Sequence, residues 1–448
     1  MADAADGVCS SERESWGRYP KARHVVRHVS WPSDVLPLES DGRACLPFGR
    51  GRSYGDVCLN DNGVLLDTSR FNRFISFDKS AGTLSCEAGV PLVDILNLIV
   101  PHDFFIPVTP GTKFVSVGGA IANDVHGKNH HRAGTFGCHV LKFELLRSDG
   151  RRLICSPREN PEWFRATIGG LGLTGLILWA EFKLKPIRSA LIDWETVKFS
   201  DLREFLDLSR ESDERFDYVV AWMDCLAAGS ALGRGLLMRG NHAQTPALRP
   251  SPGVKRAPSF SLPFDAPEIL LNTPAVRAFN LLYYRKQLRK TVRRLTHFDP
   301  FFYPLDSIGR WNRLYGKRGF LQYQCVIPSA DGGDQAVKSV LETVSKSGLG
   351  PFLAVVKLFG GIPSPGMMSF PRKGVTLALD FPNRGQETLR LLGRLDEIVG
   401  ASRGAVYPAK DACMSPAGFA SGYPRWREFS KYIDPRFSSN FWRRVTSE

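Results

Sequence analysis

Three glycine-rich segments in the first half of the chain constrain its fold more than any other feature of its 448 residues. They read FGRGRSYGD at residues 48–56, TPGTKFVSVGGAIANDVHGKNHHRAGTFG at 109–137, and IGGLGLTGLILWAEFKL at 168–184. Glycine forms tight turns and leaves backbone N–H groups uncovered, so loops of this kind can hold anions or let a flat ligand approach the backbone. We therefore expect the chemistry of this protein to lie at these three loops.

The first segment contains Gly49-x-Gly51, which superficially matches a dinucleotide-binding fingerprint. A Rossmann site needs a strand before this motif and a long helix after it, whose N-terminus holds the pyrophosphate. Here an Asp- and Asn-rich stretch at 56–63 follows, and then a strand-like run. The Rossmann interpretation fails on this context, and the segment is interpreted as an anion-binding loop that Arg50 and Arg52 would strengthen.

The second segment combines a bare helix face with a polar cluster. Ser116 is placed to cap a short helix, on which Gly118, Gly119, Ala120 and Ala122 leave one face almost without side chains. Such a face lets the backbone approach a flat or phosphorylated ligand. The polar residues that follow are Asn123, Asp124, His126, Lys128, Asn129, His130 and His131.

This polar cluster has two other interpretations. It can be a hydrated loop with surface histidines, or a metal site built on His126, His130 and His131. The spacing H-x3-H-H has no cysteine nearby and matches no familiar set of zinc ligands, so we expect no metal.

The charge of the chain is concentrated in one segment. With 59 Lys and Arg against 45 Asp and Glu the net charge is +14, and residues 234–294 contribute +10 of it from twelve basic and two acidic residues. A uniformly basic chain would favour nucleic acid as the partner. A single basic segment in an otherwise nearly neutral chain favours a local anionic partner instead.

The cysteines and the N-terminal sequence indicate the compartment. Nine scattered cysteines without a CxxC pair form neither a zinc pattern nor a disulfide framework, which is typical of a reducing compartment. The first twenty residues carry acids and no apolar run, so we expect no secretory signal. No stretch approaches the roughly 18–20 apolar residues that span a bilayer, and any membrane contact is expected to be peripheral.

Hydrophobic periodicity predicts an α+β protein. Strands are expected at 63–67, 82–87, 141–147, 320–327, 353–358 and 375–381, and helices at 92–100 and 386–399. The second half is therefore expected to form an antiparallel sheet covered by helices. Between the halves, residues 241–267 contain six prolines and little periodicity, so we expect a mobile loop there.

A basic helix is predicted after this loop, in the sequence LLYYRKQLRKTVRRLTHF at 281–298. An apolar stripe at helical spacing would be formed by Leu281, Tyr284, Leu288, Val292 and Leu295. The stripe can pack on the core of the protein, or it can lie on an anionic membrane at about residues 277–294.

Taken in order, the three glycine-rich segments resemble the FAD-binding domain of vanillyl-alcohol-oxidase (PCMH-type) flavoenzymes. In that family the first loop wraps the pyrophosphate, the second runs along it to the isoalloxazine, and the third reaches the adenine end. Further motifs, including GGAIANDVHGKNHHRAGTFG, FFYPLDSIGRWNRLYG, VVKLFG, LDFP and YPAKD, resemble the decaprenylphosphoryl-β-D-ribose 2′-oxidase family. The likeness runs from about residue 48 to residue 411.

The resemblance implies two lobes. An FAD-binding domain of the PCMH type would span residues 1–189, and a segment at 404–448 would return to it. A substrate-binding α+β cap built on an antiparallel sheet would span residues 190–403, with a mobile basic insertion at about 240–295.

The resemblance also assigns a cofactor site. Residues expected to line FAD are Gly49, Arg50, Gly51, Arg52, Ser53, Tyr54, Gly55, Gly111, Thr112, Ser116, Val117, Gly118, Gly119, Asn123, Asp124, Val125, His126, Ile177 and Tyr407. Many relatives tether the flavin through a histidine just before the serine of the first loop. Arg52 occupies that place here, so we expect noncovalent FAD.

Oxidation of an alcohol needs a base for the hydroxyl proton, and Lys410 in YPAKD is the expected one, because a lysine out of water can have its pKa lowered toward neutrality. His126 and Lys357 are the other expected catalytic residues. Gln322 and Gln324, two apart on a strand, would share one face and bind the sugar. The weaker candidates for substrate binding are Lys128, Tyr303 and Trp222. Thr376 and Ala378 depart from the family pattern, which has Asn and Cys there.

The activity implied by the resemblance is oxidation of the 2′-hydroxyl of a polyprenylphosphoryl-β-D-ribose to the 2′-keto form, the first half of an epimerisation to the arabinose donor of cell-envelope glycans. Its expected partners are a separate NAD(P)H-dependent short-chain reductase, a quinone or other electron acceptor, and an anionic membrane on the cytoplasmic or periplasmic face. Two alternatives remain open at this point: an oxidase of small soluble polyols or aldonolactones, and a nonenzymatic nucleic-acid-binding protein.

Overall fold

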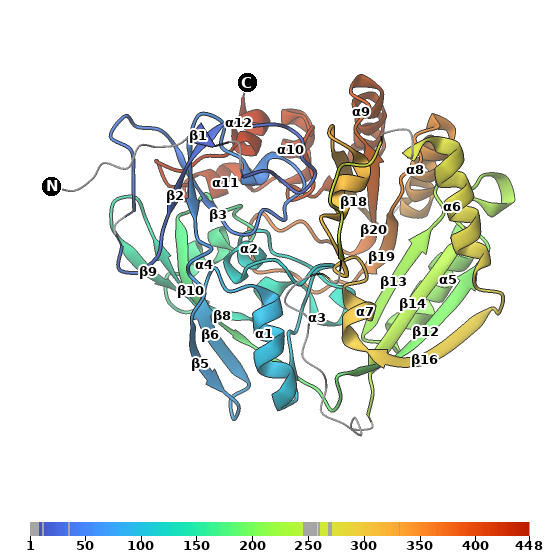
Figure 1. Cartoon of the computed structure of the whole chain (residues 1–448), viewed down its shortest axis with the longest axis horizontal. Coiled ribbons are helices and arrows are strands. Elements are labelled where there is room, and N and C mark those ends of the chain that lie inside the picture. Colours follow the sequence, from blue (N-terminus) through green and yellow to red (C-terminus); the bar gives the residue numbers. More distant parts are fainter. Residues whose placement is uncertain are drawn as a thin grey trace.

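The computed structural model describes residues 9–10, 13–34, 36–244, 258, 260–267, 271–330 and 332–447. Two lobes lie side by side, with the blue and teal strands of the N-terminal half in one and a large sheet in the other (Figure 1). The fold is the α+β arrangement that the periodicity predicted. Much of the proline-rich loop expected to be mobile, at 245–257 and 259, lies outside the described residues.

The N-terminal lobe contains two sheets. The first has the order β1-β2-β4-β3, with parallel pairs on both sides of β4. Its strands are β1 (Cys9–Ser10), β2 (His24–His28), β3 (Cys45–Phe48) and β4 (Val64–Asp67). The second sheet is antiparallel, with the order β5-β6-β10-β8-β9. Its strands are β5 (Phe74–Asp78), β6 (Thr83–Glu87), β8 (Val140–Leu146), β9 (Arg152–Cys155) and β10 (Leu176–Lys183).

Short helices and the glycine-rich loops connect these strands. The helices of this lobe are α1 (Leu92–Ile99), α2 (Val117–Ala122), α3 (His130–Ala133) and α4 (Pro161–Thr167). Ser116 caps α2 as predicted, since its side chain accepts a hydrogen bond from Gly119 N at 3.3 Å. After the first glycine-rich loop comes only a single 3₁₀ turn, Asp56–Cys58, so the long helix of a Rossmann site is absent from this described segment. β7 (Phe104–Phe105) pairs with β11 (Lys185–Pro186).

The second lobe is built on an eight-stranded sheet of order β16-β12-β14-β13-β19-β20-β18-β21, in which every pairing is antiparallel. Its strands are β12 (Leu191–Phe199), β13 (Tyr218–Met223), β14 (Gly235–His242), β16 (Thr291–His297), β18 (Phe320–Pro328), β19 (Ala354–Phe359), β20 (Gly374–Pro382) and β21 (Ala405–Val406). The strands predicted at 320–327, 353–358 and 375–381 are confirmed.

Helices cover both faces of this sheet. The apolar sides of α5 (Leu202–Asp213), α8 (Gly333–Ser347) and α9 (Gln386–Ala401) share one hydrophobic core with alternate residues of the central strands. On the other face lie α6 (Thr273–Arg285) and α7 (Phe298–Phe302), which line the cavity described below. A small parallel pair joins β15 (Phe260–Ser261) to β17 (Ile308–Gly309).

The C-terminal segment connects the two lobes. It contains α10 (Pro416–Gly422), α11 (Trp426–Ser430) and α12 (Asn440–Thr446), which lie beside β1 and β3 in Figure 1. Arg444 of α12 forms 2.8 Å ion pairs with two buried carboxylates, Asp56 of the N-terminal lobe and Asp411. Arg444 therefore fixes the residue that follows Lys410 relative to the first glycine-rich loop.

The predicted basic helix at 281–298 is wrong. Helix α6 ends at Arg285, and residues 291–297 form the edge strand β16, which pairs with β12 along its length. The apolar stripe is thereby split between helix α6, the loop that follows it and strand β16. Leu288 is 91% exposed and Leu295 is 60% exposed. The period of the apolar residues fitted a helix, but pairing with β12 supplies backbone hydrogen bonds that the periodicity cannot anticipate.

The excess charge of residues 234–294 is also partly neutralised by acids from other segments. Arg234 pairs with Asp224 at 2.8 Å, and Arg239 donates to Glu195 at 2.7 Å. Lys290 pairs with Glu204, and Arg293 also pairs with Glu195. The count of +10 along the sequence therefore overstates the charge that this region presents to solvent.

Within the described ranges, no helix combines the length and the apolar character needed to cross a bilayer.

Candidate active site

A cavity of about 1010 Å³ lies between the lobes. One wall consists of the three glycine-rich loops of the N-terminal lobe, and the other is the open face of the eight-stranded sheet with α6 and α7 beside it. We call these the loop wall and the sheet wall.

The loop wall offers backbone donors for an anion. Among the described residues, the backbone N–H groups of residues 50–53 have no hydrogen-bond acceptor within the protein. Gly51 has φ of +59°, the left-handed conformation that turns successive N–H groups toward one point. The first loop therefore has the donors that a pyrophosphate requires.

Close approach within the loop wall explains why particular positions are glycine. A Cβ on Gly49 would lie 2.5 Å from Ser116 Oγ, and one on Gly118 would lie 3.0 Å from the Cβ of Ala88. Gly111 is different, because a Cβ there would meet no protein atom within 4 Å although the residue lines the cavity. Together these glycines leave a cradle that a flat, phosphorylated cofactor such as FAD fits.

The third loop completes this wall. Leu171 and Gly172, both with positive φ, line the cavity together with Gly175, Leu176 and Ile177 at the start of β10.

The structure brings most of the predicted cofactor residues to the cavity. Those that line it are Gly49, Arg50, Gly51, Arg52, Ser53, Tyr54, Gly111, Thr112, Ser116, Gly118, Gly119, Asn123, Val125, His126, Ile177 and Tyr407. The hydroxyl of Tyr407 donates to the carbonyl oxygen of Asn123 at 2.7 Å, which ties the C-terminal segment to the second loop.

Three predicted cofactor residues lie behind the wall instead. Gly55 packs against the backbone of Asp411, where a Cβ would overlap the carbonyl oxygen. Val117 is fully buried, because the inner face of α2 packs on the core. Asp124 is buried and accepts hydrogen bonds from Gly137 N and from the hydroxyls of Ser364 and Ser369, so it organises the loop.

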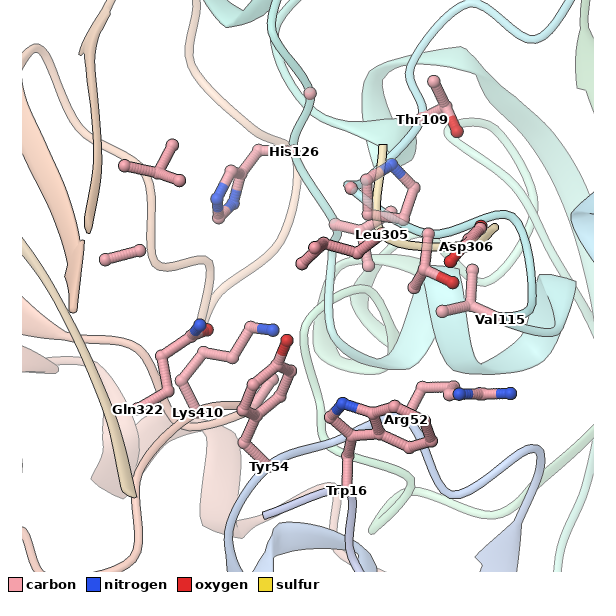
Figure 2. Close-up of a pocket in the computed structure, with 18 of the residues that line it drawn as sticks. Trp16, Arg52, Tyr54, Thr109, Val115, His126, Leu305, Asp306, Gln322 and Lys410 are labelled. Atoms are coloured by element: carbon pink, nitrogen blue, oxygen red, sulfur yellow. The ribbon is translucent and has the colours of Figure 1, made fainter. Parts of the chain in front are cut away.

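Arg52, at the place of the tethering histidine in many relatives, stacks on aromatic rings. Its guanidinium carbon lies 4.2 Å from the ring centroid of Trp16 and 5.3 Å from that of Phe114. Burial lowers the pKa of Arg52, and the carboxylate of Asp306 opposes that shift. Figure 2 shows Arg52 beside Trp16, with Tyr54 between this pair and Lys410.

The sheet wall is set by strand register. With the exception of Ala221, the residues that line the cavity from its strands alternate with residues that face the opposite side, as the two-residue period of a strand requires. The lining residues are Gln322 and Gln324 of β18, Thr376, Ala378 and Asp380 of β20, Val355 and Lys357 of β19, Val220 and Trp222 of β13, Leu236 and Met238 of β14, Trp194 and Thr196 of β12, and Val292 and Arg294 of β16.

Polarity changes across this wall in the order of the strands. β18 and β20 present amides and a carboxylate, β19 presents Lys357 beside Val355, and β13 and β14 present apolar side chains. Trp222 packs on Tyr283 of α6 with ring centroids 4.6 Å apart. The cavity therefore has a polar end, lined by β18 and β20, and an apolar section, lined by β13 and β14.

Lys410 lies at the polar end, with its Nζ 3.5 Å from the ring centroid of Tyr54 (Figure 2). Burial lowers the pKa of Lys410, and the negative charge of Asp380 opposes that shift. Burial raises the pKa of Asp380, whose carboxylate accepts a hydrogen bond from the Gln322 amide. Lys410 is thus a lysine that can lose its proton near neutrality, as a general base must.

His126 faces the same end of the cavity and is held as a neutral ring. The amide nitrogen of Gln324 donates to its Nε2 at 2.9 Å, and the same amide donates to Thr376 Oγ1 at 3.4 Å. Burial, followed by the charges of Lys357, His130 and Lys410, lowers the pKa of His126 well below its usual value. The hydrogen bond places the ring proton on Nδ1.

Two more lysines point into the cavity from opposite walls. Lys357 Nζ donates to the carbonyl oxygen of Gly127 at 3.1 Å, and Lys128 Nζ donates to that of Phe302 at 3.1 Å. Burial, followed by the charges of Lys128 and Lys410, lowers the pKa of Lys357 to about 7. Burial lowers the pKa of Lys128 to about 8.

Of the predicted substrate residues, Gln322, Gln324, Lys128 and Trp222 line the cavity. Tyr303 does not line the cavity. Its ring is buried, and its hydroxyl shares a 2.7 Å hydrogen bond with Thr109 Oγ1 behind the loop wall. A tyrosine in a conspicuous motif looks the same in sequence whether it faces a ligand or the core.

Sequence reasoning assigned no role to Asp380, Trp16 or Asp306. A signal for Asp380 did exist, because Thr376, Ala378 and Asp380 alternate in VTLALDF and must share one face of the strand. Trp16 and Asp306 carried no comparable signal, since they come from segments far from Arg52 in the chain.

The fold and the cavity define an FAD-dependent oxidoreductase: a glycine-rich cradle faces a sheet that carries a basic residue of lowered pKa. In agreement, the FAD binding domain family matches residues 37–156. The chain is 36% identical over 450 residues to a decaprenylphosphoryl-beta-D-ribose oxidase of Mycolicibacterium smegmatis, with 96% of each chain covered. The chain therefore belongs to the decaprenylphosphoryl-beta-D-ribose oxidase family.

Other relatives match less of the chain or carry less specific descriptions. An uncharacterized protein in the mprA 5′ region of Streptomyces coelicolor is 33% identical over 376 residues, which cover 80% of this chain and 100% of that one. The L-gulonolactone oxidase of Mus musculus is 30% identical over 197 residues, or 43% of each chain.

Proposed function

We propose that the protein oxidises the 2′-hydroxyl of a polyprenylphosphoryl-β-D-ribose to the 2′-keto product. The observation that carries the proposal is the lysine of lowered pKa at the polar end of a cavity whose apolar section can take a lipid tail. The similarity to the decaprenylphosphoryl-beta-D-ribose oxidase of Mycolicibacterium smegmatis, which extends along almost the whole chain, supports the same substrate class.

FAD held by the loop wall supplies the hydride acceptor for this reaction. Residues of both walls, together with Lys410 of the segment after β21, perform the remaining work. Neutral Lys410 takes the hydroxyl proton onto Nζ, and Tyr54, stacked on it, limits the positions its side chain can adopt. Gln322 and Gln324 present amides on one face of β18 to the sugar hydroxyls. His126, neutral and fixed by Gln324, offers a further hydrogen bond from Nδ1.

The substrate class is tested by anaerobic bleaching of the flavin absorbance. Purified protein is mixed with a short-chain polyprenylphosphoryl-β-D-ribose, with ribitol, or with gulonolactone. Bleaching by the lipid-linked ribose alone is the expected result. Bleaching by ribitol or gulonolactone at comparable concentrations would instead establish an oxidase of small soluble substrates.

We further propose that the FAD is noncovalent, because Arg52 occupies the place of the tethering histidine and is engaged by Trp16. Precipitating the holoprotein with acid is expected to release the yellow colour into the supernatant. Colour that stays in the pellet contradicts this proposal.

A quinone is the proposed electron acceptor, and a separate NAD(P)H-dependent short-chain reductase is the proposed partner that reduces the keto product to the arabinose epimer. Incubation of both enzymes with the lipid-linked ribose, a soluble quinone that reoxidises the flavin, and NADH or NADPH is expected to yield the lipid-linked arabinose. Neither enzyme alone should do so.

We also propose peripheral binding to anionic membranes, through the α6–β16 region. Leu282, Leu288 and Leu295 are at least 60% exposed there, near Arg285 and Arg289. Replacing the three leucines with serine is expected to reduce flotation with anionic vesicles several-fold, and reversing the charge of Arg289 should reduce it further. Unchanged flotation with a normal FAD content would refute this surface.

A further inference from the structure

Two buried lysines in the cavity have no counter-charge. Within the described part of the chain, neither Lys128 nor Lys357 forms an ion pair with a carboxylate. The nearby charges that act on Lys357 are those of Lys128 and Lys410, and both are repulsive. Burying a cation without a partner is costly, so such a pair is retained where a ligand supplies the missing negative charge.

Lys410 differs from this pair. The carboxylate of Asp380 acts on it favourably, and no acid in the described residues does so for Lys128 or Lys357. Lys410 is thus balanced by the protein itself, while the other two lysines leave the cavity with unsatisfied positive charge. The three lysines therefore have different tasks.

Lys128 and Lys357 each have N–H donors that no acceptor among the described residues uses. An ammonium group has three donors. Lys357 uses one on the carbonyl oxygen of Gly127, and Lys128 uses one on that of Phe302. Because Gly127 is the neighbour of Lys128 in the chain, the contact of Lys357 brings the two side chains to the same part of the cavity from opposite walls.

The position of Lys357 in the sheet gives the order of groups along the cavity. Its partner in β20 is Thr376, on the side of the amides of β18, while Val355 of the same strand pairs with Trp222 of β13. Lys357 therefore stands between the polar end and the apolar section. A polyprenylphosphoryl sugar has the same order of groups: sugar, phosphate, lipid.

We propose that Lys128 and Lys357 form a clamp for the phosphate of the substrate, and that they select a phosphodiester-linked sugar over a neutral one. The inference rests on the proposed function and refines it by separating recognition from proton transfer. Lys128 reaches the phosphate from the loop wall and Lys357 from the sheet wall, and Lys410 remains free for the hydroxyl proton.

The phosphates of FAD do not require this pair. The first glycine-rich loop supplies free N–H groups at residues 50–53 together with Arg50 and Arg52, and all of these belong to the loop wall. Lys357 projects from the middle of the sheet wall, on a different element, among residues that face the substrate space.

The clamp is tested by comparing two ligands of equal chain length, a short polyprenyl phosphate and the corresponding polyprenol, in titrations followed by flavin fluorescence. Wild-type holoenzyme is expected to bind the phosphate much more tightly. Lys357→Met and Lys128→Met each remove one charge at nearly constant side-chain length. Each is expected to lower affinity for the phosphate about 10- to 100-fold, as charge-assisted hydrogen bonds predict, and to leave polyprenol affinity unchanged.

Lys410→Met is the matched control, because it removes a buried lysine from the same cavity. It should lower kcat by about 10²–10⁴-fold but retain the preference for phosphate over alcohol. FAD content and melting temperature, measured for all three variants, show whether each one folds.

Each outcome decides a separate point. Retention of the phosphate preference in both Lys128→Met and Lys357→Met overturns the clamp. The clamp is also overturned if Lys410→Met loses as much of the preference for phosphate as Lys128→Met and Lys357→Met do. Wild-type protein that oxidises the lipid-linked ribose yet binds both ligands equally overturns the clamp and leaves the proposed function standing. Failure of the wild type to oxidise the lipid-linked ribose overturns the proposed function itself.

Discussion

The two walls of the cavity form their binding surfaces in opposite ways. The loop wall works through missing side chains: Gly49 and Gly118 let loops touch, and Gly111 leaves open space. The sheet wall works through side chains that strand register brings to one face, such as Gln322 opposite Asp380. A wall built on glycine is visible in the sequence as a motif, whereas a wall built on register becomes visible only when strands are paired.

The largest expected effect tests whether proton transfer belongs to the polar end of the cavity and not to the loop wall. Lys410→Met is expected to lower kcat by about 10²–10⁴-fold, the usual contribution of a general base. FAD binding should persist, because the loop wall is untouched. Steady-state kinetics together with the flavin absorbance of the purified variant give both values. A kcat within a few-fold of wild type would remove Lys410 from the mechanism.

The next effect tests the open space of the loop wall. Gly111→Val is expected to raise the dissociation constant of FAD about 10- to 100-fold, because Gly111 lines the cavity and its added side chain extends into space that no atom of the described residues fills within 4 Å. Gly393→Val in α9 is the control, since a Cβ there also meets nothing within 4 Å but lies far from the cavity lining. Titration of apoprotein with FAD compares them. Equal affinities would mean that FAD does not occupy the space beside Gly111.

A smaller effect concerns the charge that balances Lys410. In Asp380→Asn the negative charge that raises the pKa of Lys410 is lost, so this pKa should fall. Activity requires neutral Lys410 and rises as pH increases through its pKa, so the acidic limb of the kcat/KM profile should move to lower pH. We also expect kcat to fall about tenfold, because the acceptor of Gln322 changes from a charged carboxylate to a neutral amide oxygen and the hydrogen bond weakens. A profile that keeps its position would show that Asp380 only supports the fold.

The smallest effect concerns the apolar section. Trp222→Ala is expected to raise KM for a long-chain polyprenylphosphoryl ribose about tenfold, and to raise it less for a substrate with a very short tail, because apolar contact area is lost. Trp31→Ala, which changes an exposed tryptophan, is the control and should leave both values as they are. Equal losses for both substrates would place the tail elsewhere.

Local features of the fold were predictable to different degrees. The cap at Ser116 and the strands at 320–327 and 375–381 follow from the residues themselves, through capping chemistry and alternation. The helix predicted at 281–298 failed, because pairing with β12 decided the conformation of 291–297. The pairing of β16 depends on β12, a strand almost a hundred residues earlier in the chain, and the local spacing of apolar residues cannot reveal such a partner.

The candidate site divides along the same line. Lys410 and most of the loop-wall residues were reached through motifs and a family resemblance. Asp380 was not, because its importance lies in its pairing with Gln322 and in its charge near Lys410. Only packing shows that the ring of Tyr303 is buried and that its hydroxyl contacts Thr109, one of the residues that line the cavity.

The cofactor-binding loops could be recognised from the amino-acid sequence, because glycine spacing acts through local backbone conformation and needs no distant partner. The sequence also determined the α+β class. The folded structure was needed to show which lysine has a counter-charge, which basic residues are neutralised, and where the polar end meets the apolar section. The physical reason is that burial and electrostatic interaction depend on distance in space, and residues such as Lys128 and Lys357 become neighbours only after eight strands and two lobes are in place.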